Sequence, residues 1–152
     1  MKVRPGKGVH LVLDRPISDV GVMTEAVDGR QIFLEPWENA ALIGTTDDDT
    51  YADLDDLPVT TDEVRYLLEG IERVLPRVRD ARVIGTTVGA RPTLYTYGVN
   101  EDALSREHEV LDHAKDGVRN LFSLIGGKLA SYRLFAEEAG DLIAPLLNVS
   151  AR

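Results

Sequence analysis

The clearest pattern of apolar and polar positions predicts an amphipathic helix over residues 61–75. Apolar residues recur there at intervals of three and four, which places them on one face of a helix. These residues are Val64, Leu67, Leu68, Ile71, Val74 and Leu75. Thr60 and Glu63 have the spacing of a capping box at its start, and Pro76 ends it. We therefore expect one helix whose single apolar face covers a sheet.

Short apolar runs separated by turn residues predict that this sheet is mostly antiparallel. The dipeptide Asp28-Gly29 is a typical hairpin turn, and the segment 36–39 separates two further runs. Successive hairpins favour antiparallel pairing over βαβ units. Strands are expected at residues 9–13, 20–27, 31–34, 41–43, 82–88, 109–112 and 121–125. The fold class that follows is α+β, with one mostly antiparallel sheet, a covering helix and a C-terminal helix.

The last expected strand leads into a turn with distinctive chemistry. Gly126-Gly127-Lys128 follows the apolar run 121–125, which we expect to be buried, and precedes a helix at about 129–146. This order would bring backbone N–H donors, the positive end of a helix dipole and an ammonium group to one place. Such a place suits an anion or an electron-rich ring. The alternative is a flexible connection that happens to end in a lysine.

Composition and charge exclude several classes of function. The chain has 152 residues, which predicts one domain, and a net charge of −9, which argues against a general nucleic-acid binder. It has no cysteine, so disulfides, thiolate metal sites and cysteine nucleophiles are excluded. No apolar run approaches the length of a membrane span. The motifs of serine hydrolases, P-loops and dinucleotide-binding turns are also absent.

A run rich in aspartate, residues 47–56, is the one candidate for a metal site. It contains six aspartates but lacks the central glycine and the terminal glutamate of an EF-hand. The three histidines, His10, His108 and His113, have no spacing typical of zinc ligands. We expect a solvated loop at residues 47–56 and no metal.

Four residues are candidates for binding or catalysis. His10 lies inside an apolar strand, where it is either a satisfied core histidine or a functional one. Arg91 precedes Pro92, so its restricted backbone could aim the guanidinium rigidly from a strand end; the alternative is an exposed arginine at a turn. Arg106 lies in a polar stretch, and Lys128 stands at the predicted helix entry.

Several motifs, taken in order along the chain, point to one family. They are Lys7-Gly8-Val9-His10, Asp28-Gly29-Arg30 with Phe33 and Pro36-Trp37, Ile43-Gly44-Thr45-Thr46-Asp47, Tyr66-Leu67-Leu68, Gly89-Ala90-Arg91-Pro92 and Gly126-Gly127-Lys128-Leu129. The series closely resembles the respiratory, FAD-dependent glycerol-3-phosphate dehydrogenases of the D-amino-acid-oxidase-like flavoprotein superfamily. The resemblance covers essentially the whole chain. The stretch 111–117 is most similar to the large subunit of the anaerobic branch.

The resemblance implies a role for each matching candidate. His10 becomes a substrate contact or proton acceptor, Arg91 a substrate contact beside the flavin, and Arg106 a phosphate contact. Lys128 is implied in catalysis and in substrate binding. The implied flavin-edge positions are Gly126, Gly127, Lys128, Leu129 and Ala130.

The chain departs from the family pattern at two places. The family usually has a threonine pair where this chain has Ala130-Ser131. Ser131 keeps a hydroxyl and is an implied substrate contact, whereas Ala130 has no side-chain donor. The family also usually has valine where this chain has Ala90, which reduces the side-chain volume.

The resemblance also implies how the chain is organised. Residues 1–120 would form a substrate-binding α+β domain, and residues 121–152 a strand–turn–helix at the flavin edge that belongs to the flavin-binding half. The family's N-terminal dinucleotide-binding half has no counterpart in this sequence. We therefore expect a fragment that is inactive alone and binds FAD weakly or not at all.

The complete enzyme implied by the resemblance oxidises sn-glycerol 3-phosphate to dihydroxyacetone phosphate. It would use FAD, with a quinone or an electron-transfer subunit as acceptor, and it would be cytoplasmic and peripheral to the membrane face. Two alternatives stay open: another amine or hydroxy-acid oxidase of the superfamily, and a non-catalytic binding module. The joint presence of Arg91, Arg106 and the Gly-Thr-Thr-Asp motif argues against another oxidase.

Overall fold

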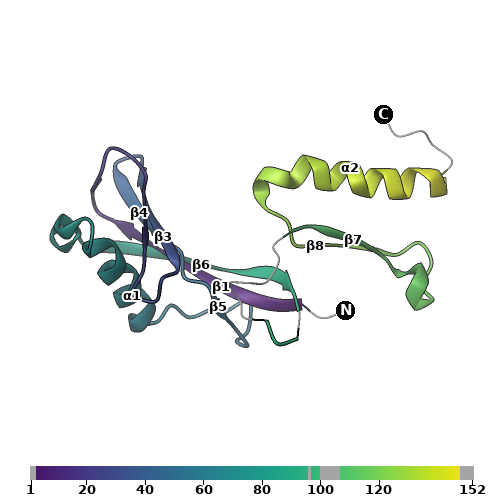
Figure 1. Ribbon diagram of the computed structural model, residues 1–152, viewed down its shortest axis with the longest axis horizontal. Helices are drawn as coiled ribbons and strands as arrows, with labels where there is room; N and C mark the ends of the chain where they lie inside the picture. Colours follow the sequence, from purple (N-terminus) through teal and green to yellow (C-terminus); the bar gives the residue numbers. More distant parts are fainter. Residues whose placement is uncertain (1–2, 96, 100–106, 148–152) are drawn as a thin grey trace. The chain divides into compact units, whose positions relative to one another are not determined.

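The protein is described by a computed structural model that covers residues 3–95, 97–99 and 107–147 (Figure 1). It has a mixed, mostly antiparallel α+β architecture with a C-terminal helix, as the sequence predicts. The chain divides into two compact units. One is Pro5–Arg91; the other contains the described residues before Pro5 and after Arg91. This division separates parts of the chain that are compact in themselves. It does not test the functional boundary predicted at residue 120, which stays a prediction.

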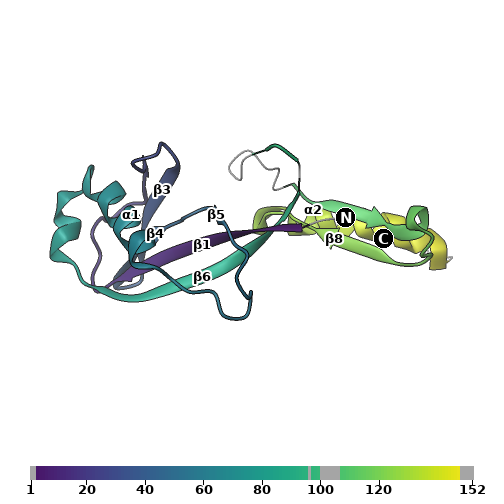
Figure 2. The same cartoon turned by 90° about the horizontal axis from the view of Figure 1, so that it is seen from below.

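The main sheet contains six strands in the order β2-β3-β4-β1-β5, with β6 paired to β1 (Figure 2). Antiparallel pairing joins β1 to β4 and β5, and β3 to β2 and β4. The strands are β1 (Val3–Leu13), β2 (Val22–Glu25), β3 (Gln31–Trp37), β4 (Ala40–Gly44), β5 (Asp48–Asp49) and β6 (Val83–Leu94).

Both predicted hairpins are present. Asp28-Gly29 lies in the turn between β2 and β3, where Gly29 has a φ of 85° that favours glycine. The second turn is shorter than the sequence suggests, because Pro36 and Trp37 belong to β3 and only two residues separate it from β4. Tight turns of this kind fix the strand register, and they bring the ends of β3 and β4 together.

The helix α1 (Thr61–Glu72) begins with the predicted capping box. The Glu63 amide donates to the Thr60 hydroxyl at 3.2 Å, and the Thr60 amide donates to the Glu63 carboxylate at 2.8 Å. The α-helix ends three residues earlier than predicted and is followed by a 3₁₀ helix, Pro76–Asp80. The proline explains this, because it disfavours helical geometry at Leu75, whose φ and ψ are −130° and 77°.

The hydrophobic core lies between α1 and one face of the sheet. Side chains alternate along the second half of β1, so that Val9, Leu11 and Leu13 are fully buried in this core. The buried apolar residues of the core are Val9, Leu11, Leu13, Ile17, Ala26, Ile32, Leu34, Ala41, Ile43, Leu67, Ile71 and Val78. The opposite face of β1 carries Gly8, His10 and Val12, which leaves His10 outside the core.

Strand β6 is longer than predicted and includes the whole Gly-Ala-Arg-Pro motif. Arg91 therefore lies within a strand, and the predicted place at a strand end or turn is wrong. Pro92 explains the extension, because it favours extended backbone at the residue before it. A proline is tolerated here because β6 pairs only with β1 among the described strands.

The second unit is a hairpin followed by a helix. Strands β7 (Glu109–Asp112) and β8 (Phe122–Ile125) pair antiparallel, and α2 (Tyr132–Ile143) follows after a short 3₁₀ turn, Leu129–Ser131. A further 3₁₀ turn, Ala144–Leu147, ends the described chain.

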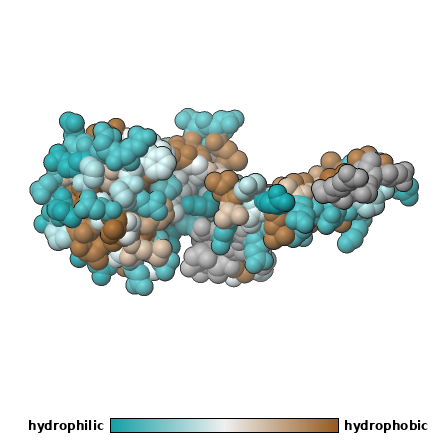
Figure 3. Space-filling view, turned by 90° about the horizontal axis from the view of Figure 1, so that it is seen from above, coloured by the Kyte–Doolittle hydropathy of each residue, from teal (hydrophilic) through white to brown (hydrophobic). Residues whose placement is uncertain are grey.

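One prediction for this unit is wrong. The apolar run 121–125 is not a buried strand: Ile125 is buried, but Leu121 and Leu124 are 48% and 52% exposed. A two-stranded hairpin with one covering helix can bury only one of its faces. The helical segment spans residues 129–147, close to the predicted 129–146, although its first and last turns are 3₁₀. Apolar side chains are visible among polar ones on the surface of both units (Figure 3).

Candidate functional site

Two glycines on β1 make room for the polar groups of the candidate site. Gly6 and Gly8 lie on the face of β1 that carries His10. A Cβ added at Gly8 would lie 2.7 Å from the Arg91 Cζ, and one added at Gly6 would lie 3.3 Å from the Asp47 carboxylate. The absence of side chains on this strip allows Asp47 and Arg91 to lie directly on the backbone of β1.

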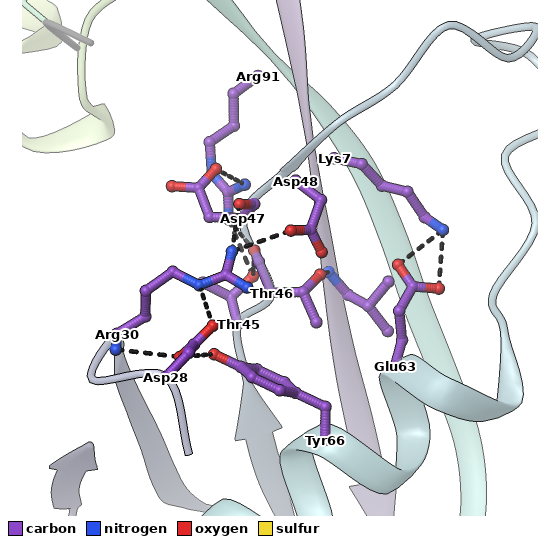
Figure 4. A network of polar contacts seen from close by, with 11 residues as sticks. Lys7, Asp28, Arg30, Thr45, Thr46, Asp47, Asp48, Glu63, Tyr66 and Arg91 are labelled. Atoms are coloured by element: carbon purple, nitrogen blue, oxygen red, sulfur yellow. Dashed lines mark hydrogen bonds and ion pairs between the residues drawn. The ribbon is translucent and has the colours of Figure 1, made fainter. Parts of the chain in front are cut away.

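The guanidinium of Arg91 donates hydrogen bonds to the segment Thr45, Thr46 and Asp47 (Figure 4). Nη1 donates to the Asp47 carboxylate at 3.1 Å, and Nη2 donates to the Thr45 hydroxyl at 2.9 Å. Nη2 also donates to the Thr46 carbonyl at 3.3 Å. With a quarter of its side chain exposed, Arg91 is a fixed cation that still reaches solvent.

The segment that receives Arg91 is itself fixed to β1. The amide of Val9 donates to the Thr46 hydroxyl at 3.0 Å, and β5 pairs with Gly6 and Lys7. Asp47 is only 14% exposed in its side chain and forms an ion pair with Arg91. The prediction of a solvated aspartate loop is therefore wrong at its start, because a tertiary partner compensates the charge.

Arg30 fixes the same segment from the opposite direction. Its Nη1 donates to the Asp47 carbonyl at 2.5 Å and to the Asp48 carboxylate at 3.0 Å (Figure 4). Its Nε donates to Asp28 at 2.7 Å, and the hydroxyl of Tyr66 donates to Asp28 at 2.9 Å. These contacts tie the β2–β3 turn, the aspartate segment and α1 together.

His10 stands on the helix-free face of the sheet, half-buried. Its ring lies over Gly44, where an added Cβ would be 2.8 Å from the ring Cγ of His10. The ring centres of His10 and Phe33 are 5.7 Å apart. Burial and the charge of Arg91 lower the pKa of His10, while Glu35 raises it to a smaller extent. Because the net direction is downward from 6.5, the imidazole is neutral at pH 7 and able to accept a proton.

Lys7 has a different role from the histidine that shares its motif. Its side chain points to the other face of β1, where its ammonium lies 2.7 Å and 2.8 Å from the two carboxylate oxygens of Glu63. Glu63 is also the capping residue of α1. Lys7 therefore fastens β1 to the start of the helix, which sequence reasoning did not identify.

The Gly-Gly-Lys turn lies in the second unit. Gly126 and Gly127 have φ angles of 71° and 89°, which L side chains rarely adopt, and a Cβ at Gly126 would overlap the Glu107 carbonyl. The Ser131 hydroxyl donates to the Lys128 carbonyl at 2.9 Å and accepts from the Lys128 amide at 3.3 Å. The turn is thus shaped by its own backbone and by the Ser131 hydroxyl.

The helical segment follows Lys128 directly, as predicted, but its first turn is 3₁₀ and not α-helical. The 3₁₀ turn Leu129–Ser131 separates the glycines from the start of α2, so the α-helix does not follow the lysine directly. The helix dipole acts mainly within the first turn of a helix. The positive character of the glycine turn therefore comes from the exposed Lys128, while Leu129 is 90% exposed and Ala130 is exposed beside it.

The other two histidines connect elements of the second unit. His113 lies between Asp116 and Ser123, with Nδ1 and Nε2 each 2.8 Å from their oxygens. His108 contacts Glu138 on α2 through Nε2 at 2.9 Å. Both residues join parts of the hairpin or link it to the helix, and neither lies with His10 in the Pro5–Arg91 unit.

Among the predicted site residues, the structure brings His10 and Arg91 together in the Pro5–Arg91 unit. Residues 126–131 are gathered in the other unit, and Arg106 lies outside the described residues. Within the described ranges, no group of three acidic or histidine side chains could hold a metal ion. The described helices include none long and apolar enough to cross a membrane.

Sequence reasoning did not assign a role to Thr45, Asp47 or Arg30. The sequence signal for these residues was the presence of Gly-Thr-Thr-Asp and Asp-Gly-Arg among the family motifs. Nothing in their local sequence indicates that these segments meet, since Arg30 and Arg91 approach Asp47 from distant parts of the chain.

Comparison with known proteins supports the resemblance on which these roles rest. A family model described as DAO, FAD dependent oxidoreductase, matches residues 1–132. The chain is 41% identical to a glycerol-3-phosphate dehydrogenase of Synechocystis sp., over 99% of this chain and 28% of that protein. It is 36% identical to an aerobic glycerol-3-phosphate dehydrogenase of Staphylococcus aureus, over 97% of this chain and 27% of that protein.

Solved structures give the same picture. A glycerol-3-phosphate dehydrogenase from Bacillus halodurans, complexed with FAD, matches with a TM-score of 0.79 at 33% identity. The match covers 99% of this chain and 28% of that one. A glycine oxidase from Bacillus cereus matches with a TM-score of 0.57 at 17% identity, over 95% of this chain and 36% of that one, which shows a shared fold alone. The chain thus spans just over a quarter of the length of the dehydrogenases that it matches.

Proposed function

The chain belongs to the family of FAD-dependent oxidoreductases, and from that premise we propose that it supplies the substrate side of a glycerol-3-phosphate dehydrogenase active site. The dehydrogenases named above are similar along almost the whole chain, which supports this choice of substrate. The observation that carries the proposal is the neutral His10 beside the fixed cation Arg91. Oxidation of a secondary alcohol needs both a proton acceptor and a group that orients the hydroxyl.

His10 is the proton acceptor in this proposal. The flavin, when bound, supplies the hydride-accepting chemistry of the oxidation. The remaining task at the substrate is removal of the hydroxyl proton, and a neutral imidazole performs it near pH 7. The packing of the ring against Gly44 and Phe33 limits its rotation, which keeps the acceptor nitrogen oriented.

Arg91 orients the substrate beside His10. Its ion pair with Asp47 compensates much of its charge, so it is better suited to donating a directed hydrogen bond than to attracting a phosphate dianion. We assign the phosphate mainly to Arg106 and Lys128, with Ser131 as a further contact. An arginine offers paired donors for phosphate oxygens, and a lysine offers a mobile point charge.

The residues of the Gly126–Leu129 turn fit the edge of a flavin. Two glycines without side chains permit close approach of a flat ring, and the neighbouring ammonium favours an electron-rich edge. Gly126, Gly127 and Lys128, with Leu129 and Ala130 beside them, would hold that edge. The contribution of this chain is to shape the turn and to provide the cation.

We also propose that catalysis requires a longer protein. This sequence has no dinucleotide-binding motif, and it spans just over a quarter of the length of its relatives. The electron acceptor in this proposal is a quinone or an electron-transfer subunit at the cytoplasmic face of the membrane. This part is supported only by the resemblance to respiratory enzymes.

The test uses the FAD-containing protein that carries this chain, mixed anaerobically with glycerol 3-phosphate, glycerol or glycine. Bleaching of the flavin absorbance by glycerol 3-phosphate far below the concentration that glycerol requires supports the proposal. Rapid reduction by glycine instead would identify an amine oxidase. In the Arg106→Ala variant, KM should rise much more for glycerol 3-phosphate than for glycerol; an equal rise would remove Arg106 from the phosphate site.

A further inference from the structure

We propose that Asp47 is a positioning residue, whose carboxylate holds the guanidinium of Arg91 on the glycine strip of β1 beside His10. Asp47 reaches neither the substrate nor the flavin in this proposal, and it acts only through Arg91. The inference deepens the function proposed above and rests on it for its catalytic consequence. Its geometric part concerns this chain alone.

Asp47 is placed between two arginines that come from different elements. Its backbone carbonyl accepts from Arg30 at 2.5 Å, and its carboxylate accepts from Arg91 at 3.1 Å. Arg30 is in turn fixed by Asp28 and Asp48. The backbone of Asp47 is therefore held on one side while its side chain holds Arg91 on the other.

The contact of Arg91 with Asp47 differs from its contacts with Thr45 and Thr46. Thr45 and Thr46 offer neutral oxygens, and both accept from the same nitrogen, Nη2. Asp47 offers a charged acceptor to Nη1, and hydrogen bonds between charged partners are roughly twice as strong as neutral ones. Two nitrogens held at once, Nη1 by Asp47 and Nη2 by Thr45 and Thr46, define the plane of the guanidinium.

The surroundings of His10 make this positioning measurable. Within the described part of the chain, the charged groups that act on the imidazole are Arg91 from β6 and Glu35 from β3, with opposite effects on its pKa. Strand β4, which lies between β1 and β3, brings Gly44 and Leu42, which carry no charge. A guanidinium released from its place would weaken its effect on the imidazole.

The first experiment follows the pH titration of His10 by NMR in the 152-residue chain. The signal of His10, one of three histidines, is assigned by its loss in His10→Gln. Asp47 is not among the causes of the lowered pKa of His10, so Asp47→Ala acts on the imidazole through Arg91 and should raise its pKa; Arg91→Gln sets the size of the rise expected for complete loss of the cation. Asp62→Ala is the matched control, because its carboxylate pairs with Arg65 outside this network and is 91% exposed. An unchanged or lower pKa in Asp47→Ala, or an equal rise in the control, would overturn the proposal.

A second variant protects the test against loss of folding. Asp47→Asn keeps an acceptor oxygen and loses the charge, so the His10 pKa should rise by less than in Asp47→Ala. In the FAD-containing protein, Asp47→Ala should lower kcat for glycerol 3-phosphate by roughly 10- to 100-fold, the usual cost of removing a supporting residue. Asp47→Glu should recover part of the lost activity. An NMR shift without turnover of glycerol 3-phosphate would leave the positioning intact and refute the proposed substrate.

Discussion

Lys7 and Glu63 form an ion pair that connects the first strand to the start of the helix, with both side chains almost fully removed from solvent. The ammonium lies 2.7 Å and 2.8 Å from the two carboxylate oxygens, and the side chains are 10% and 12% exposed. The amide and hydroxyl of Thr60 donate to the same carboxylate. Each charge therefore depends on its partners for the hydration that it has lost.

Replacing Lys7 with methionine should destabilise the protein strongly. Removal of one partner leaves the carboxylate of Glu63 largely buried without its cation, which typically costs about 3 kcal/mol or more. Urea unfolding monitored by circular dichroism measures this loss. Arg65→Ala is the control, because Arg65 pairs with Asp62 at the exposed surface, where a pair contributes about 1 kcal/mol at most. Equal effects from both variants would contradict the structural role of Lys7.

The same pair predicts how stability depends on pH. Burial by itself raises the pKa of Glu63, but hydrogen bonds from Lys7 and Thr60 outweigh it and lower the pKa below 4.5. A carboxylate with a lowered pKa stabilises the fold above its unfolded pKa, and this stabilisation is lost as the pH falls through the folded value. The stability difference between the wild type and Glu63→Gln should therefore shrink as the pH falls below 4.5. A difference that is constant from pH 7 to pH 3 would contradict the assignment.

The pKa of His10 should respond in opposite directions to two neighbouring charges. Arg91→Gln removes a cation and should raise the pKa, while Glu35→Gln removes an anion and should lower it. Burial is the largest cause of the lowered value, so Arg91→Gln should leave the pKa below 6.5. NMR titration of the ring protons measures all three proteins, and shifts of the same sign in both variants would refute the placement of His10.

Gly44 should not tolerate a side chain, because the ring of His10 occupies its space. Gly44→Ala would force the imidazole away from β4, since the added Cβ would lie 2.8 Å from its Cγ. We expect a displaced His10 resonance and a lower Tm. Gly89→Ala is the control, because Gly89 is also in a strand but has no atom within 4 Å of an added Cβ. An unshifted His10 signal in Gly44→Ala would show that the ring lies elsewhere.

The elements that the sequence predicted well are those specified by neighbouring residues. The capping box of Thr60 and Glu63 defines the start of α1, and Asp28-Gly29 defines the first hairpin. Both signals act within a few residues, where turn and cap chemistry decide the conformation. Family motifs then indicated His10 and Arg91 among the implied substrate contacts, and in the structure the charge of Arg91 acts on His10.

The parts that the sequence could not predict depend on contacts between distant segments. Asp47 lies in a segment, residues 47–56, that has the composition of a solvated loop. Arg91 nevertheless pairs with it from 44 positions further along the chain. Pro92 favours extended backbone at Arg91, but the pairing of β6 with β1 is not specified by the local sequence. Leu121 and Leu124 are apolar but exposed, so the apolar run 121–125 did not predict burial correctly.

The most direct test of the proposed function is the rate of flavin reduction in the FAD-containing protein that carries the His10→Gln variant. Stopped-flow mixing with glycerol 3-phosphate, without oxygen, separates this step from reoxidation. Loss of the proton acceptor should lower the rate by about 10²- to 10⁴-fold, with flavin content and substrate affinity nearly unchanged. Reduction at the wild-type rate would contradict the account, because His10 would then have no part in the oxidation.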